Sequence, residues 1–149
     1  RFVAFETDDA LRPGLDTNGR VDVYVRDMDR AIDDPAAFEL ISARDGSAGG
    51  ANFDAANARQ GARSGRPAAS ISDDGNRVLF VVPVASDLAG VVTSTQAFPT
   101  PAGQLFVRDR DRQATIPVNV ERDERSGLPT EQAVGGAVAQ DLAALSADW

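Results

Sequence analysis

The sequence contains one pattern twice, and this internal repeat limits the folds that are open to the chain. Residues 25–30, Val-Arg-Asp-Met-Asp-Arg, return as residues 107–112, Val-Arg-Asp-Arg-Asp-Arg, each time directly after an aromatic residue. Shorter matches keep the same order: residues 1–5 match 77–81, and residues 70–75 match 144–149. Matches in a constant order with drifting spacing are typical of repeat folds whose loops differ in length. We therefore predict two units, residues 1–75 and 76–149.

Each unit contains four short segments with the character of β-strands. Residues 2–5 and 78–82 are continuously apolar, as in a strand that is buried on both faces. Val21, Val23 and Val25 show the period of two of a half-buried strand. The remaining candidates are 105–107 in the second position, 38–42 and 115–120 in the third, and 68–72 and 143–146 in the fourth. The predicted fold class is all-β, with one four-stranded antiparallel sheet in each unit.

Two segments refine this prediction. Asp74-Gly75 stands between two apolar segments and predicts a tight hairpin turn, because glycine accepts the positive φ that such a turn requires. Residues 130–145 place apolar side chains at near-helical spacing, although Gly135 and Gly136 weaken a helix there. A short helix is therefore an alternative for this part of the second unit, ahead of the strand at 143–146.

The composition excludes several classes of chemistry. The chain has no His and no Cys, and all 15 of its cationic residues are arginine. Disulfides, thiolate and imidazole metal ligands, a cysteine nucleophile and a histidine-based triad are therefore excluded. A net charge of −8 and a pI near 4.4 argue against nucleic acid or an anionic membrane as a partner. The longest apolar run, residues 78–85, is far shorter than the ~20 residues of a membrane helix, so we expect no membrane insertion.

A family resemblance follows from the strand and turn motifs of the two units. The motifs are residues 2–8, 16–19 and 22–27 in the first unit, and Ser72-Asp73-Asp74-Gly75 followed by Phe106-Val107-Arg108-Asp109 further along the chain. Together they resemble the TolB-type, WD-like β-propeller repeat of bacterial envelope and secreted proteins. The second unit departs from the pattern, since it lacks the Asp-Thr-Asn-Gly element of the first.

The resemblance implies a β-propeller fragment made of two four-stranded antiparallel blades, and a periplasmic or extracellular location. Propellers close with ~4–8 blades, so two blades alone would leave apolar faces uncovered. We therefore expect further blades in a longer parent chain, or self-association of several copies.

Asp16, Asn18 and Asp22 form the one candidate metal site. They place oxygen atoms at relative positions 1, 3 and 7, and carboxylate and amide oxygens are the ligands that Ca²⁺ prefers. The alternative is an Asx-type turn, in which Asn18-Gly19 reverses the chain and Asp22 begins a strand. The first interpretation predicts calcium as the only cofactor, and the second predicts none.

Other motifs have structural interpretations. The Asp-Asp pairs at 8–9, 33–34 and 73–74 are typical of solvated turns rather than of catalytic carboxylates. The repeated pairs Arg26-Asp27 and Arg108-Asp109 are interpreted as ion pairs or loop-tethering hydrogen bonds at strand ends. Phe53 and Phe98 lie in the long polar segments 44–66 and 83–103, which we predict to be loops, and they are candidate binding contacts.

These observations predict a non-catalytic binding or scaffold module whose loops contact a protein or a glycan. Two alternatives stay open. One is the propeller part of a hydrolase of the serine peptidase type, and the other is a structural module stabilised by calcium.

Overall fold

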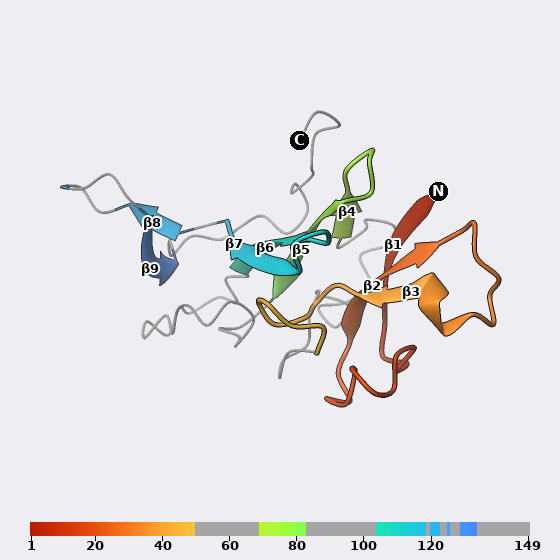
Figure 1. Ribbon diagram of the computed structural model, residues 1–149. Helices are drawn as coiled ribbons and strands as arrows, with labels where there is room; N and C mark the ends of the chain where they lie inside the picture. The colour runs from red at the N-terminus through yellow and green to blue at the C-terminus, as the bar shows by residue number, and fades with distance from the viewer. Residues whose placement is uncertain (50–68, 83–103, 119, 123–124, 126–128, 134–149) are drawn as a thin grey trace, which may run out of the picture.

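The computed structural model describes residues 1–49, 69–82, 104–118, 120–122, 125 and 129–133 (Figure 1). In this part of the chain the fold is all-β, with nine strands in three antiparallel sheets and a single turn of 3₁₀ helix at Pro35–Ala37. The predicted all-β class is thus confirmed for the described residues. None of these residues forms a helix long and apolar enough to pass through a lipid bilayer.

The first sheet has three strands in the order β1-β2-β3. Its strands are β1 (Phe2–Thr7), β2 (Asp22–Asp27) and β3 (Phe38–Leu40). The central strand is buried on both sides, since Val23, Tyr24 and Val25 are all at most 1% exposed. Its β-branched and aromatic residues make this segment a favourable strand, and it pairs with β1 on one side and β3 on the other.

The second sheet has four strands in the order β4-β5-β6-β7. They are β4 (Ala69–Ile71), β5 (Arg77–Val82), β6 (Gln104–Asp109) and β7 (Ala114–Pro117). A separate two-stranded sheet joins β8 (Val120–Arg122) to β9 (Pro129–Ala133). Residues 129–133 are therefore a strand, and the remainder of the predicted helical segment and the strand at 143–146 lie outside the described residues.

The assignment of the fourth strand to the first unit is wrong at the level of the sheets. β4 pairs with β5 in the second sheet, so the described part of the first sheet has three strands instead of four. The cause is the tight turn at residues 72–76, where Gly75 has φ +75° and Ser72 N–H donates to the carbonyl of Arg77 at 2.9 Å. A turn this short makes its two flanking strands pair with each other. The predicted unit boundary at residue 75 falls inside this hairpin.

The two large sheets use the same register around the repeated motif. Phe2 lies opposite Asp27 in the first sheet, and Arg77 lies opposite Asp109 in the second. Residues of β1 therefore correspond to those 75 positions later, whereas the sequence match of 1–5 with 77–81 implies 76. The one-residue difference matters, because a shift of one residue moves every side chain of a strand to the opposite face.

The two sheets pack face to face around a shared apolar core. Val23 and Val25 of β2 and Ile41 form one buried cluster with Val78, Phe80 and Phe106. We call the face of the second sheet that carries Val78, Phe80, Phe106 and Arg108 its front face. The face of the first sheet that this front face covers is the back face of the first sheet. By the shared register, the front face of the first sheet carries Val3, Phe5, Tyr24, Arg26 and Phe38.

Candidate functional site

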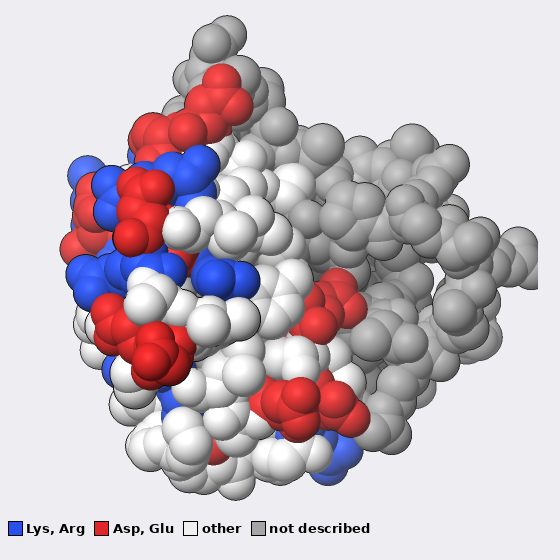
Figure 2. All heavy atoms as spheres, turned by 90° about the vertical axis from the view of Figure 1, so that its right-hand side faces the viewer, with Lys and Arg blue, Asp and Glu red and all other residues white. Residues whose placement is uncertain are grey.

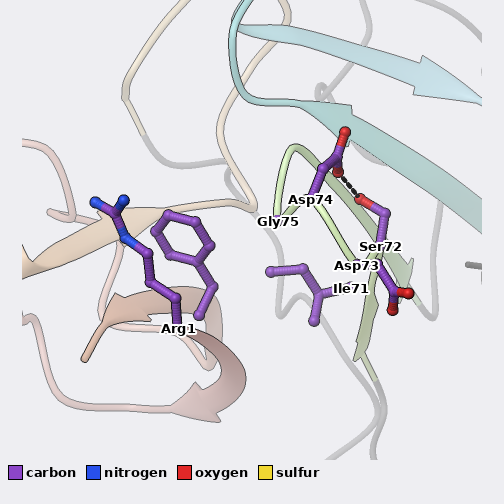
Figure 3. A pocket seen from close by; sticks show the side chains of 7 residues that line it. Arg1, Ile71, Ser72, Asp73, Asp74 and Gly75 are labelled. Carbon is purple, nitrogen blue, oxygen red and sulfur yellow. Dashed lines mark hydrogen bonds between the residues drawn. The ribbon is translucent and has the colours of Figure 1, made fainter. Parts of the chain in front are cut away.

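A cavity of about 390 Å³ opens between the start of β1 and the turn from β4 to β5, where the two sheets meet (Figure 3). Its lining combines apolar, acidic and basic side chains: Arg1, Phe2, Ile71, Ser72, Asp73, Asp74 and Gly75. Ligand sites are often concave places of this kind at the junction of two packed units. The sequence predicted the turn and placed Phe2 in a strand, but it gave no signal that the two adjoin.

The turn that forms one wall is held by its own side chains. The Ser72 hydroxyl donates to the Asp74 carboxylate at 2.6 Å, and the same carboxylate oxygen accepts from Asn76 N–H at 2.8 Å. These hydrogen bonds lower the pKa of Asp74, and the one from Ser72 has the largest effect. The wall is therefore preorganised, and the Asp74 carboxylate stabilises it by accepting these hydrogen bonds.

The opposite wall is the ring of Phe2, which lies between two guanidinium groups. Arg1 is 4.8 Å and Arg110 is 4.6 Å from the centroid of the ring. Arg110 also pairs with Glu39 of β3 at 2.7 Å and donates to the carbonyl of Gly75. The side chain of Arg110, which directly follows β6, therefore ties together β1, β3 and the β4–β5 turn.

The charges around the cavity are partly neutralised. Arg1 makes two hydrogen bonds to Asp27, at 3.0 and 2.8 Å, and these hold the pKa of Asp27 at about 2. Arg1 keeps more than half of its side chain exposed. Asp73 is exposed, and no partner for its carboxylate lies among the described residues. The cavity thus offers one free carboxylate and one accessible guanidinium to a ligand.

The predicted calcium residues are bonded to protein donors. The Tyr24 hydroxyl donates to Asp16 at 2.5 Å, and burial followed by this hydrogen bond raises the pKa of Tyr24. Asp22 accepts from the Ser42 hydroxyl at 2.5 Å and from the Asn18 amide at 2.8 Å. In the described part of the chain, no three acidic side chains lie together in a group that could hold a metal ion.

This arrangement of hydrogen bonds is that of the Asx-type turn. Asn18 accepts from Arg20 N–H through its oxygen, so its amide nitrogen faces Asp22. Gly19 has φ +64° and reverses the chain. A calcium ion would need these oxygens turned toward one point, and the calcium site stays a prediction.

The repeated Arg-Asp pairs do make the predicted ion pairs and loop-tethering hydrogen bonds, with partners elsewhere in the chain. Asp27 bonds to Arg1 and Asp109 bonds to Arg112, so neither aspartate pairs with the arginine beside it. Neighbouring residues of a strand point to opposite faces, and this separates them. Arg108 instead enters the interface between the sheets, where it is 1% exposed.

The other Asp-Asp pairs lie in turns, as the sequence indicates. Asp9 N–H donates to the Thr7 hydroxyl at 3.0 Å, and the Asp34 carboxylate accepts from Ala36 N–H at 2.8 Å at the start of the 3₁₀ turn. The candidate binding contacts Phe53 and Phe98 lie outside the described residues.

Comparison with known proteins does not extend this picture. No protein-family model matches the chain, and neither the curated proteins nor the solved structures gave a significant match.

Proposed function

We propose that this chain is a non-catalytic interaction module of the β-propeller type, in which the two large sheets are neighbouring blades. The observation that carries the proposal is the repetition itself. Two antiparallel sheets with the same register place the same Val-Arg-Asp motif at the same point, and they pack front face to back face. Blade-on-blade packing of this kind is how propellers cover their apolar faces.

The resemblance to TolB-type, WD-like repeats supports a place in the bacterial envelope or among exported proteins. A chain without cysteine and with 15 cationic residues that are all arginine gives no argument against such a location. The location is therefore proposed on the resemblance of the motifs alone.

The binding surface we propose is the cavity at the sheet junction. Asp73 supplies an acceptor for hydroxyl or amide groups, and Arg1 supplies donors. Both are groups that peptides and glycans engage, and the tied Ser72–Asp74 turn holds Asp73 in place. A rigid scaffold that presents a few polar groups on its loops is suited to recognition.

The same cavity supports binding rather than catalysis. The two carboxylates of its wall are both exposed but are not equivalent, because Asp74 is engaged by Ser72 and Asn76 while the carboxylate of Asp73 has no partner among the described residues. A general acid or base needs a pKa matched to its task, and the pKa of Asp74 is lowered instead. No observation favours the hydrolase-support or the calcium-stabilised alternative over this proposal.

The test screens the immobilised chain against an array of bacterial envelope glycans and against a library of displayed peptides. Each ligand is then titrated by calorimetry against the native chain, Asp73→Asn and Asp111→Asn. Asp111 is the matched control, since it is exposed in the next turn and does not line the cavity. We expect Asp73→Asn to weaken binding by roughly tenfold, the value of one charged hydrogen bond, and Asp111→Asn to leave it unchanged.

Three results would contradict the proposal. They are the absence of any ligand in both libraries, ligands that are indifferent to Asp73→Asn, and chemical conversion of a bound ligand by the chain.

A further inference from the structure

The two sheets have corresponding front faces, and the packing of the molecule leaves part of one of them open. In the first sheet, Tyr24 and Leu40 of this face are buried in a local cluster with Leu11 and Leu15, and the part at β1 is open. In the second sheet Val78 and Phe80 are completely buried against the first sheet. Their counterparts in the first sheet are Val3 and Phe5. Val3 is 46% exposed. The first sheet therefore presents outward, at β1, part of the face with which the second sheet binds.

This outward face is hollow and largely apolar. It contains a groove of about 480 Å³, whose lining includes Val3, Phe5, Met28, Ile32 and Phe38. Figure 2 looks onto the side of the first sheet, where uncharged side chains occupy the middle of the view and charged ones gather around them. An apolar patch with a polar rim is typical of a protein–protein contact.

The opposite end of the stack, the back face of the second sheet, is open at β7, whereas Leu79 and Val107 in the middle of the same face are buried. The back face of the second sheet carries Ile116 and Val118, which are 48% and 43% exposed. Val118 corresponds to Ile41 of the first sheet, because each donates its N–H to the matching residue of the central strand. Ile41 is completely buried by the second sheet.

All the exposed large hydrophobic residues of the described chain belong to these two ends. They are Val3, Met28 and Ile32 at the front, and Ile116 and Val118 at the back.

The repeated arginine shows how such a contact is fixed. In the covered front face, Arg108 donates to the carbonyls of Arg44 at 3.1 Å and of Ser47 at 2.6 Å, in the turn that follows β3. Its counterpart Arg26 lies over the ring of Phe38, 5.9 Å from the centroid. Among the described residues no hydrogen-bond acceptor meets the Arg26 guanidinium.

We propose that the front face of the first sheet binds the back face of the second sheet of another copy of this chain, head to tail. The occupant is chosen by the internal interface, where a front face already covers a back face. Val3 and Phe5 then pack on Ile116 and Val118, and Arg26 donates to carbonyls beyond β7. A contact between unlike faces builds a ring if the rotation closes and an open chain if it does not.

The proposal is independent of ligand binding at the cavity. The groove on the front face and the cavity at the sheet junction have no lining residue in common. Either can therefore fail while the other holds.

The test measures the mass of the full 149-residue chain by sedimentation velocity over a series of concentrations. Ile32→Asp blocks the front face and Ile116→Asp blocks the back face, while Ala31→Asp adds the same charge one residue away, at an exposed position that does not line the groove. We expect the native chain and Ala31→Asp to associate as the concentration rises. We expect each blocked variant alone to stay monomeric, and Arg26→Met to associate at least roughly tenfold more weakly.

Mixing the two blocked variants gives the decisive result. Each keeps the face that the other has lost, so the mixture should form one-to-one dimers and nothing larger. Dimers of Ile116→Asp alone would mean that two front faces meet, and this would overturn the proposal. A native chain that stays monomeric at every concentration would also overturn it, since the occupant would then be a different polypeptide.

Circular dichroism and the unfolding midpoint of each variant show that the fold is kept. If Ile116→Asp unfolds β7, Val118→Asp replaces it, because Val118 lies beyond the end of that strand.

Discussion

Gly75 is required both by the backbone geometry of its turn and by the close contact of that turn with the first sheet. It has φ +75°, and a Cβ at this position would overlap Cδ2 of Phe2. Gly19 has a similar φ of +64° but has open space where its Cβ would be. Comparing Gly75 with Gly19 therefore separates the effect of positive φ from the effect of the contact with the Phe2 ring.

We expect Gly75→Ala to lower the free energy of unfolding by about 2–3 kcal/mol, and Gly19→Ala by about 1 kcal/mol. The second value is the cost of a side chain at positive φ, and the excess in the first is the displacement of Phe2. Urea unfolding of the two variants and the native chain measures both. Equal losses would show that Phe2 moves aside without cost.

Glu6 is a charged residue in an apolar position of the first sheet. Its Oε1 atom is buried, with no hydrogen-bond partner in the described chain, and burial raises the pKa of Glu6. The corresponding residue of the second sheet is Val81. Removing the charge should therefore stabilise the protein.

We expect Glu6→Val to raise the free energy of unfolding by about 1 kcal/mol at neutral pH. A group whose pKa is higher in the folded state stabilises at low pH, and this contribution is lost as the pH rises through that pKa. The advantage of the valine should thus shrink toward acidic pH, as Glu6 becomes protonated. Glu6→Gln is the control that removes the charge but keeps the polar group. A gain that does not change with pH would contradict this account.

At the scale of the strand, Arg108 and Arg26 occupy the same register position with different surroundings. Arg108 is buried and bonded to the carbonyls of Arg44 and Ser47 and to the Thr115 hydroxyl at 2.8 Å. Burial lowers the pKa of Arg108, and it stays protonated because arginine titrates far above neutral pH. Arg26 meets only the ring of Phe38 among the described residues.

We expect Arg108→Met to lower the free energy of unfolding by about 3 kcal/mol, because it leaves buried carbonyl groups without donors. Arg26→Met is the matched control and should cost under about 1 kcal/mol, the value of an exposed cation–π contact. Both substitutions keep the apolar stem of the side chain. Thermal and urea unfolding at concentrations where the chain is monomeric give the comparison, and similar losses would mean that Arg108 contributes through packing alone.

The sequence predicts the elements better than it predicts their partners. The alternation of Val23 and Val25 and the Asp74-Gly75 turn are local signals, and β2 and the β4–β5 hairpin lie where these signals place them. The sheet to which β4 belongs depends on which strand it pairs with. The match of residues 70–75 with 144–149 assigned β4 to the first sheet, whereas it pairs in the second. A repeat fixes the order of its segments, whereas the turn length decides which strands pair.

The cavity was predictable only in part for the same reason. Ser72, Asp73, Asp74 and Gly75 were expected to form a turn, and they do so with a network of side-chain hydrogen bonds. The contact of that turn with Phe2, and the bond from Arg110 to Gly75, join residues far apart in the chain. Only the packing of one sheet on the other brings them together, and a single sequence carries no signal for it.

At the scale of the whole molecule, the distribution of charge sets the response to pH. Asp27 has a pKa of about 2, and the main cause is its hydrogen bonding to Arg1. The pKa values of Asp34 and Asp74 are lowered by donors in their own turns. Each carboxylate fastens a turn at a strand end. The chain has no histidine or cysteine, so Glu6 is the described residue with the clearest reason to titrate above the usual carboxylate range.

We therefore expect the free energy of unfolding of Glu6→Val to be flat from about pH 5 to 8 and to fall below about pH 4. A carboxylate whose pKa is lowered by folding stabilises above its unfolded pKa of about 3.9, and this contribution is lost as the pH falls toward the folded value of about 2 for Asp27. Urea unfolding at a series of pH values measures the curve. In Asp27→Asn the acid-side fall should be shallower, because the proton no longer competes with Arg1. A fall between pH 6 and 8 in the background of Glu6→Val would contradict this account, because the carboxylates that fasten the turns have lowered pKa values and lose their charge only at acidic pH.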